Sequence, residues 1–202
     1  IMVLSTYKKI AYSLHIGNNE DPTMLVDIDG GYEEILSDQG MSRLKWDYTG
    51  EIIFGKYNDS LISIDIKTKE VRSYIRYGNL DFAISSASSA IVFHSEIDGY
   101  LHLFDYELET DRQLLAHSGW RNFAISPNEM YVAFVGHELY VSDIETSTLD
   151  TIYDVSGRDT KPSWNFSSNK ISYDSGDGMF IYSLTTKENI YYSGTFSDPS
   201  FY

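Results

Sequence analysis

Short apolar runs recur along the chain, and each is followed by a stretch in which apolar and polar residues alternate. Five runs share a pattern of two apolar or small residues before an aromatic: Ile10-Ala11-Tyr12, Ile52-Ile53-Phe54, Ile91-Val92-Phe93, Val132-Ala133-Phe134 and Ile171-Ser172-Tyr173. The aromatics recur at intervals of roughly 40 residues, the length of one unit in several repeat folds. The pattern therefore predicts five copies of one small β unit.

Each predicted unit contains four strands. The alternating stretches are typical of strands with one buried face, and they cover residues 24–28, 61–65, 101–105, 139–143 and 180–184. A polar turn and a weaker outer strand follow. After a glycine, a short segment then leads to an aromatic, which is Trp46, Phe82, Phe123, Trp164 or Phe201. We interpret this segment as the inner strand of the next unit, so the order is inner, second, third and outer.

The second strand of each unit is apolar on both sides, which indicates that both of its faces are buried. Sheets stacked face to face around an axis, as the blades of a β-propeller are, bury their middle strands in this way. We therefore predict a single all-β domain over residues 1–202, a β-propeller of five four-stranded blades. The blades are expected at residues 5–38 with 196–202, 39–77, 78–117, 118–156 and 157–195.

The two ends of the chain suggest how the first blade is completed. The chain begins near a second strand, at residues 7–12, and ends with Asp198-Pro199-Ser200-Phe201-Tyr202, which has the pattern of an inner strand. The C-terminal strand is therefore expected to pair beside residues 7–14 and to complete the first blade, because closure removes two exposed sheet edges. A fragment of a six- or seven-bladed propeller has the same phase and is the alternative.

Composition narrows the function classes. The formal net charge of −15 opposes binding to nucleic acid and to anionic lipid surfaces, so we expect neither a nucleic-acid partner nor membrane insertion. No apolar run approaches the roughly 18 residues of a membrane-spanning helix. The absence of Cys excludes thiolate metal sites and cysteine nucleophiles. The chain is expected to be a monomer.

One copy of the repeat carries a family resemblance. Ser126-Pro127-Asn128-Glu129-Met130-Tyr131-Val132-Ala133-Phe134 resembles the "SPDGKYIAF" signature of the TolB-type WD40-like (PD40) repeats. The other copies keep turn residues but lose the Pro, as in Tyr48-Thr49-Gly50-Glu51. The resemblance implies a propeller used for protein contacts in bacterial envelope proteins or as an accessory domain in peptidases, and a periplasmic or extracellular location. It carries over no catalytic residue, because the repeat motif contains none.

Motifs for catalysis and metal binding are incomplete. There is no Gly-x-Ser-x-Gly elbow, and His137-Glu138 lacks the second His of a zinc helix. None of the Asp-Gly pairs belongs to a full calcium loop. We therefore predict no catalytic residue, no metal and no cofactor. The enzyme alternative is a carbohydrate-active propeller with carboxylates near the axis, for which only Asp81 and Asp198 lie on predicted inner strands.

Basic residues gather in the connectors that lead from outer to inner strands: Arg43, Lys45, Arg76, Arg121, Arg158 and Lys161. The loops between second and third strands are acidic, and His94 and His137 are expected at equivalent places in them. We predict a non-enzymatic platform whose connector face binds a protein, a peptide or a small polar or anionic ligand. The candidate binding residues are Lys45, Tyr77, Asp81, Trp120, Arg121, Asn122, His137, Arg158, Lys161 and Asp198. A structural accessory domain of a larger protein is a further alternative.

Overall fold

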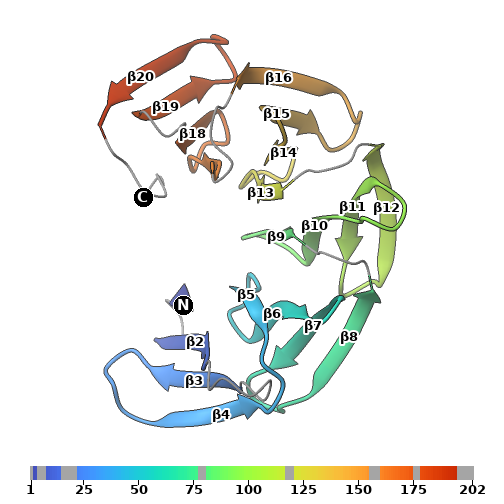
Figure 1. The fold of residues 1–202 in the computed structure, drawn as a ribbon, viewed down its shortest axis with the longest axis vertical. Helices are drawn as coiled ribbons and strands as arrows, with labels where there is room; N and C mark the ends of the chain where they lie inside the picture. Colours follow the sequence, from blue (N-terminus) through green and yellow to red (C-terminus); the bar gives the residue numbers. More distant parts are fainter. Residues whose placement is uncertain are drawn as a thin grey trace. The chain divides into compact units, whose positions relative to one another are not determined.

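The computed structural model describes residues 2–3, 8–14, 22–76, 81–116, 121–154, 160–174 and 178–194. Every regular element in these residues is a β-strand, and the strands form five four-stranded antiparallel sheets (Figure 1). Within the same residues there is no helix with the length and hydropathy needed to cross a bilayer. The chain divides into two compact units, Ile1–Leu80 and Asp81–Tyr202.

The first unit contains two sheets. The first sheet consists of β1 (Met2–Val3), β2 (Lys9–Ser13), β3 (Thr23–Asp27) and β4 (Glu33–Ser37). The second consists of β5 (Ser42–Trp46), β6 (Ile52–Tyr57), β7 (Ser60–Asp65) and β8 (Val71–Arg76). In both sheets the spatial order of the strands is their order in the chain, as expected for inner, second, third and outer strands.

The second unit contains three sheets with the same strand order. The third sheet consists of β9 (Phe82–Ile84), β10 (Ala90–His94), β11 (Tyr100–Asp105) and β12 (Thr110–Ala116). The fourth consists of β13 (Arg121–Ile125), β14 (Tyr131–Val135), β15 (Glu138–Asp143) and β16 (Leu149–Asp154). The fifth consists of β17 (Ser163–Trp164), β18 (Lys170–Asp174), β19 (Gly178–Ser183) and β20 (Asn189–Ser193).

The first sheet differs from the sequence prediction at its inner edge. The strand beside β2 is β1, in which Met2 pairs with Ala11 and Val3 with Ile10. The other side of β2 pairs with β3, so both edges of β2 are occupied. In the part of the chain that the structure describes, the inner strand of this sheet is therefore β1, in place of the expected C-terminal strand. The physical reason is that two N-terminal residues are enough to form the edge ladder, although so short a strand carries no alternating pattern. Residues 196–202 lie outside the described residues.

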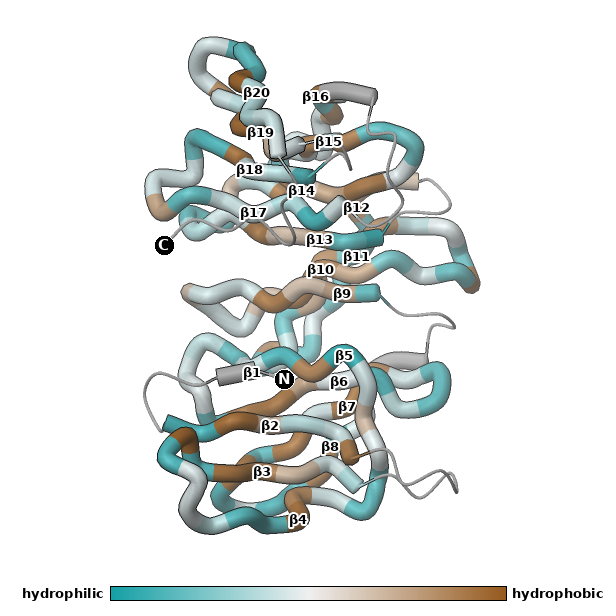
Figure 2. Tube along the Cα trace, turned by 60° about the vertical axis from the view of Figure 1, so that its left-hand side comes forward, coloured by the Kyte–Doolittle hydropathy of each residue, from teal (hydrophilic) through white to brown (hydrophobic). Residues whose placement is uncertain are grey.

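Burial follows the predicted pattern within each unit. The second and third strands supply most of the core, with Ile53, Phe54, Leu61 and Ile64 almost inaccessible in the first unit, and Figure 2 shows hydrophobic stretches along β2 and β3. In the second unit Phe134 packs between the third and fourth sheets, and Ala133 and Tyr173 between the fourth and fifth. Middle strands buried on both faces explain why the second strands are continuously apolar.

The turn between β13 and β14 shows what the signature residues do. The Ser126 hydroxyl accepts the Tyr131 N–H at 3.0 Å, while Glu129 adopts a left-handed backbone with φ of 58°. The Glu129 carboxylate accepts hydrogen bonds from the Ser85 and Ser88 hydroxyls of the third sheet. On the other side the Asn128 N–H donates to the Ser168 hydroxyl of the fifth sheet at 3.0 Å. This turn therefore ties together all three sheets of the second unit.

The Asp residues at the ends of third strands close the following turns. Asp65 accepts the N–H groups of Lys67 and Thr68, each at 2.8 Å, and Asp105 accepts those of Glu107 and Leu108, each at 3.0 Å. Hydrogen bonds to the ionised carboxylate, led by the one from the Thr68 N–H, hold the pKa of Asp65 below its usual value of 3.8. Burial tends to raise the pKa of Asp105, but the hydrogen bonds outweigh it, and the net shift is downward.

These carboxylates predict acid sensitivity in the second unit, where the Thr146 N–H likewise lowers the pKa of Asp143. A carboxyl whose pKa is lower in the folded state contributes stability above its unfolded pKa and loses it as pH falls through the folded value. We expect an Asp105→Asn/Asp143→Asn variant to lose less stability than the wild type between about pH 5 and pH 3. Urea unfolding at a series of pH values measures this. The control is Asp29→Asn, an exposed acid with no hydrogen bond to the described residues; equal slopes in both variants would contradict the expectation.

Two tryptophans end corresponding inner strands, and they differ in whether the indole N–H has a hydrogen-bond acceptor. The Trp164 indole N–H donates to the Ala124 carbonyl of the adjacent sheet at 2.9 Å. The Trp46 indole nitrogen is buried, and no described residue accepts its N–H. The adjacent inner strand in the first unit is the two-residue β1. The same residue type at the same place therefore makes an inter-sheet hydrogen bond only where the neighbouring inner strand is longer.

Candidate functional site

Three chain segments that begin inner strands meet in the second unit. They are Asp81 before β9, Arg121 and Asn122 at the start of β13, and Thr160 before β17. The Asp81 carboxylate accepts the backbone N–H of Asn122 at 2.5 Å, and the Asn122 side-chain amide donates to the Thr160 carbonyl at 2.8 Å. Hydrogen bonds thus connect the third, fourth and fifth sheets at the edge where the sequence predicts a binding face.

The ends of two second strands complete this network. The His94 N–H donates to the Asp81 carbonyl at 3.4 Å, and the Thr160 hydroxyl donates to the Asp174 carbonyl at 2.6 Å. Asn122 itself has φ of 53°, a left-handed conformation that Asn tolerates better than most residues. The register of β13 on β14 shifts between Arg121 and Ala124, so Asn122 lies in an irregular segment that turns its side chain out of the ladder.

Arg121 is the member of this group with unused hydrogen-bonding capacity. Its Nε atom is buried and finds no acceptor among the described residues. A buried donor without a partner costs roughly 1–3 kcal/mol, and an Arg can bind a carboxylate through two parallel N–H groups. Lys161 follows Thr160 and is exposed. We refer to Asp81, Arg121, Asn122, Thr160 and Lys161 as the connector cluster.

The remaining predicted site residues are distributed differently. Lys45 is half-buried on β5 in the first unit, opposite Phe54, whereas the connector cluster belongs to the second unit. His137 is exposed in the β14–β15 hairpin, on the edge of the fourth sheet where β13 begins. His94 is not its equivalent, because His94 is the last residue of β10 and is buried. Four candidates lie outside the described residues: Tyr77, Trp120, Arg158 and Asp198.

A second group of polar residues was not expected from the sequence. His102 on β11 is 3% exposed and has a carboxylate at each ring nitrogen. Its Nε2 atom lies 3.0 Å from Oδ2 of Asp98, and its Nδ1 atom lies 3.0 Å from Oδ1 of Asp111. Burial tends to raise the pKa of Asp98, but the Tyr100 N–H, the Ser95 hydroxyl and His102 outweigh it and lower that pKa overall. The ring also stacks on Phe93, with centroids 5.0 Å apart.

Comparison with solved structures defines the fold class. The chain is similar to TolB from Acinetobacter baumannii, with a TM-score of 0.70 and 18% identity, over 96% of this chain and 54% of that one. It is similar to a chain of the mitotic checkpoint complex, with a TM-score of 0.71 and 16% identity, over 94% and 63%. It is also similar to oligogalacturonate lyase from Vibrio parahaemolyticus, with a TM-score of 0.67 and 13% identity, over 94% and 63%.

These likenesses, together with the five four-stranded sheets, give the protein a TolB-like β-propeller fold. No protein-family model matches the sequence, and no curated protein matches it. The chain spans about half the length of the Acinetobacter TolB chain. Similarity at these identities establishes the fold alone, and the neighbours include both an enzyme and a protein found in a protein complex.

Proposed function

We propose that the protein is a non-enzymatic binding module that holds a carboxylate of a protein or peptide partner at the connector cluster. The observation that carries the proposal is the buried Arg121 Nε, for which no described residue provides an acceptor. A carboxylate bound by the half-buried Arg121 side chain would satisfy that donor once the atoms that cover Nε move aside, and the exposed Lys161 lies on the next inner-strand connector to add a second charge. The hydrogen bonds among Asp81, Asn122 and Thr160 would keep the backbone around Arg121 fixed before binding.

Charge favours one carboxylate over a polyanionic ligand. The net charge of −15 repels a strongly acidic partner at long range, whereas a charge-assisted hydrogen bond to a single carboxylate acts over a short distance. A peptide with a free C-terminal carboxylate and a neutral or basic body fits both conditions. Protein partners are also known for this fold, since one neighbour is a chain of the mitotic checkpoint complex.

An enzymatic role is less well supported. Of the two acids that the sequence places at inner strands, Asp81 is the one that the structure describes. Both of its carboxylate oxygens already accept backbone N–H groups, from Phe82 at 3.1 Å and from Asn122 at 2.5 Å. A general acid or nucleophile needs an oxygen available to the substrate. We therefore assign Asp81 a positioning role in the proposal.

We also propose membership in the TolB-type WD40-like repeat family. The support is the Ser126-Pro127-Asn128 turn, in which the hydroxyl and amide of the signature close the turn and connect neighbouring sheets. A bacterial periplasmic or extracellular location belongs to the same proposal.

A pair of peptides tests the proposed function. Arrays would carry identical neutral and basic sequences with either a free or an amidated C-terminus. We expect retention of free-carboxylate peptides, weakened at least about tenfold by Arg121→Ala, because a hydrogen bond to a charged group is worth roughly 1.5–3 kcal/mol. Lys170→Ala, an exposed cation beyond the opposite end of β17, is the control. Equal binding of amidated peptides, or full binding by Arg121→Ala, would refute the proposal. Retention that depends only on the positive charge of the peptide would point to a cationic partner on the acidic loops.

A further inference from the structure

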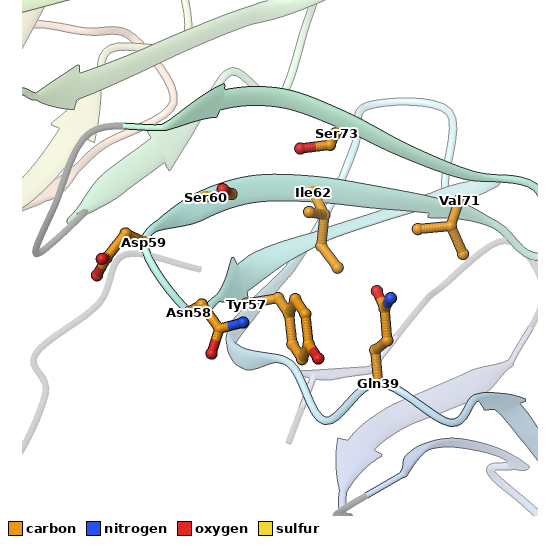
Figure 3. Close-up of a pocket in the computed structure, with 8 residues that line it drawn as sticks. All are labelled: Gln39, Tyr57, Asn58, Asp59, Ser60, Ile62, Val71 and Ser73. Carbon is orange, nitrogen blue, oxygen red and sulfur yellow. The ribbon is translucent and has the colours of Figure 1, made fainter.

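The first unit contains a cavity of about 380 Å³ beside the outer half of the second sheet. It lies between the connector that follows β4 and the strands β6, β7 and β8. The residues that line it are Gln39, Tyr57, Asn58, Asp59, Ser60, Ile62, Val71 and Ser73 (Figure 3). Its volume is at the small end of the range for ligand pockets, roughly 300–1,000 Å³. A ligand of one or two rings would fit a cavity of this size.

The sequence explains why the cavity forms in this sheet. Ile62 lies opposite Gly55. At the equivalent place in the fourth and fifth sheets, a pair of stacked rings fills the space. Phe134 stacks on Tyr140 in the fourth sheet, and Tyr173 stacks on Phe180 in the fifth. An isoleucine is shorter than those rings, so the surface beside it is hollowed. Figure 3 shows the side chains of Gln39, Tyr57 and Ile62 directed toward the hollow.

The polar side chains that line the cavity have free hydrogen-bonding capacity. Six lining side chains carry hydrogen-bonding groups: Gln39, Tyr57, Asn58, Asp59, Ser60 and Ser73. None of these six side chains makes a hydrogen bond to any part of the chain that the structure describes. Elsewhere, comparable groups such as Ser126 and Asn165 are engaged in turns. A set of convergent groups without protein partners is what a polar ligand requires.

The chemistry of the lining selects the class of ligand. Two amides and three hydroxyls both donate and accept, one carboxylate accepts, and the lining contains no Lys or Arg. Sugar hydroxyls likewise donate and accept, while the Tyr57 ring with Ile62 and Val71 offers an apolar surface to the C–H face of a pyranose. Asp59 and the net charge of −15 disfavour anions. We propose that this cavity binds a neutral sugar unit.

Saturation-transfer NMR with galactose, N-acetylglucosamine and cellobiose tests the proposal, with galacturonate as the charged counterpart. We expect transfer to at least one neutral sugar at millimolar concentration and weaker transfer to galacturonate. Ser73→Leu, which fills the cavity, is expected to weaken binding more than about tenfold, and Gln39→Ala about two- to tenfold, as the loss of one hydrogen bond would.

The matched control is Thr151→Leu, because Thr151 is exposed and pairs with Tyr140 as Ser73 pairs with Ile62. That variant should bind sugar normally, and so should Arg121→Ala, which separates this site from the proposed carboxylate site. Absence of transfer to all three neutral sugars would overturn the proposal. So would undiminished binding by both Ser73→Leu and Gln39→Ala, or galacturonate binding as tight as that of galactose.

Discussion

Replacing His102 with Ala is expected to lower the free energy of unfolding of the second unit by about 3 kcal/mol. The substitution removes a ring that is 3% exposed and stacked on Phe93, and core ring truncations cost roughly 3–5 kcal/mol. It also removes the hydrogen-bond partner of both Asp98 and Asp111. Each of these carboxylates keeps about one third of its side chain exposed, so water replaces part of what is lost.

Urea unfolding followed by Trp fluorescence measures this loss, and His102→Phe separates its two components. The Phe variant keeps an aromatic opposite Phe93, so it should recover most of the packing but none of the bonds to the carboxylates. Its stability is expected to fall between those of His102→Ala and the wild type. His137→Ala, an exposed histidine, serves as the control and should change stability by less than about 0.5 kcal/mol. A Phe variant as stable as the wild type would show that the two carboxylates contribute nothing.

The paired strands and the period of the repeat could both be predicted from the sequence, because each depends on the local pattern of apolar and polar residues. Continuous apolar second strands follow from burial on both faces. The Asp residues that end third strands close turns over a few residues. The expected contact of the connector residues in the second unit also follows from this order. Asp81, Asn122 and Thr160 do meet there, although each is about 40 residues from the next.

Features that follow from neither the repeat period nor a known motif could not be predicted. His102 is bracketed by Asp98 and Asp111 because a hairpin and the third sheet's outer strand bring them together, and no spacing rule marks such a group. The cavity beside Ile62 needs Gln39 from a connector and Ser73 from an outer strand. The pairing of β1 with β2 could not be predicted, because Met2 and Val3 are too few residues to show the alternation of a strand.

The second copy of the repeat also differs from its sequence alignment by one residue. The sequence pattern aligns Phe54 with Phe93, Phe134 and Tyr173, but the residue at their position in the structure is Gly55. The register shows this, because Gly55 pairs with Ile62 as Phe93 pairs with His102 and Phe134 with Tyr140. A shift of one residue in a strand moves a side chain to the opposite face. Phe54 accordingly packs on the other face, with its ring 5.7 Å from that of Tyr74.

This alignment leads to the second large expected effect, at Gly55 itself. A consensus of the repeat copies has an aromatic residue at this position. Even Gly55→Ala, however, is expected to destabilise the first unit by about 1–3 kcal/mol, the usual range for overpacking. A Cβ at Gly55 would lie 2.7 Å from the Met41 Cε and 2.9 Å from the Met41 Cβ. Met41 is 1% exposed and fills the place that a ring occupies in other sheets. Its Cβ cannot withdraw without moving the β5 connector.

A double-mutant cycle with Met41→Ala tests whether Met41 causes this loss of stability. The free energy of unfolding of each variant is measured by chemical denaturation. Met41→Ala alone should destabilise by creating a cavity, at a cost of roughly 2–5 kcal/mol. If the steric conflict with Met41 is the cause, Gly55→Phe should be severely destabilising in the wild type and much less so in Met41→Ala, because the ring then enters the vacated space. Coupling of this kind between touching residues is typically 0.5–3 kcal/mol. Additive effects would place the conflict elsewhere, with the Leu44 side chain, 3.1 Å from the same Cβ, as the next candidate.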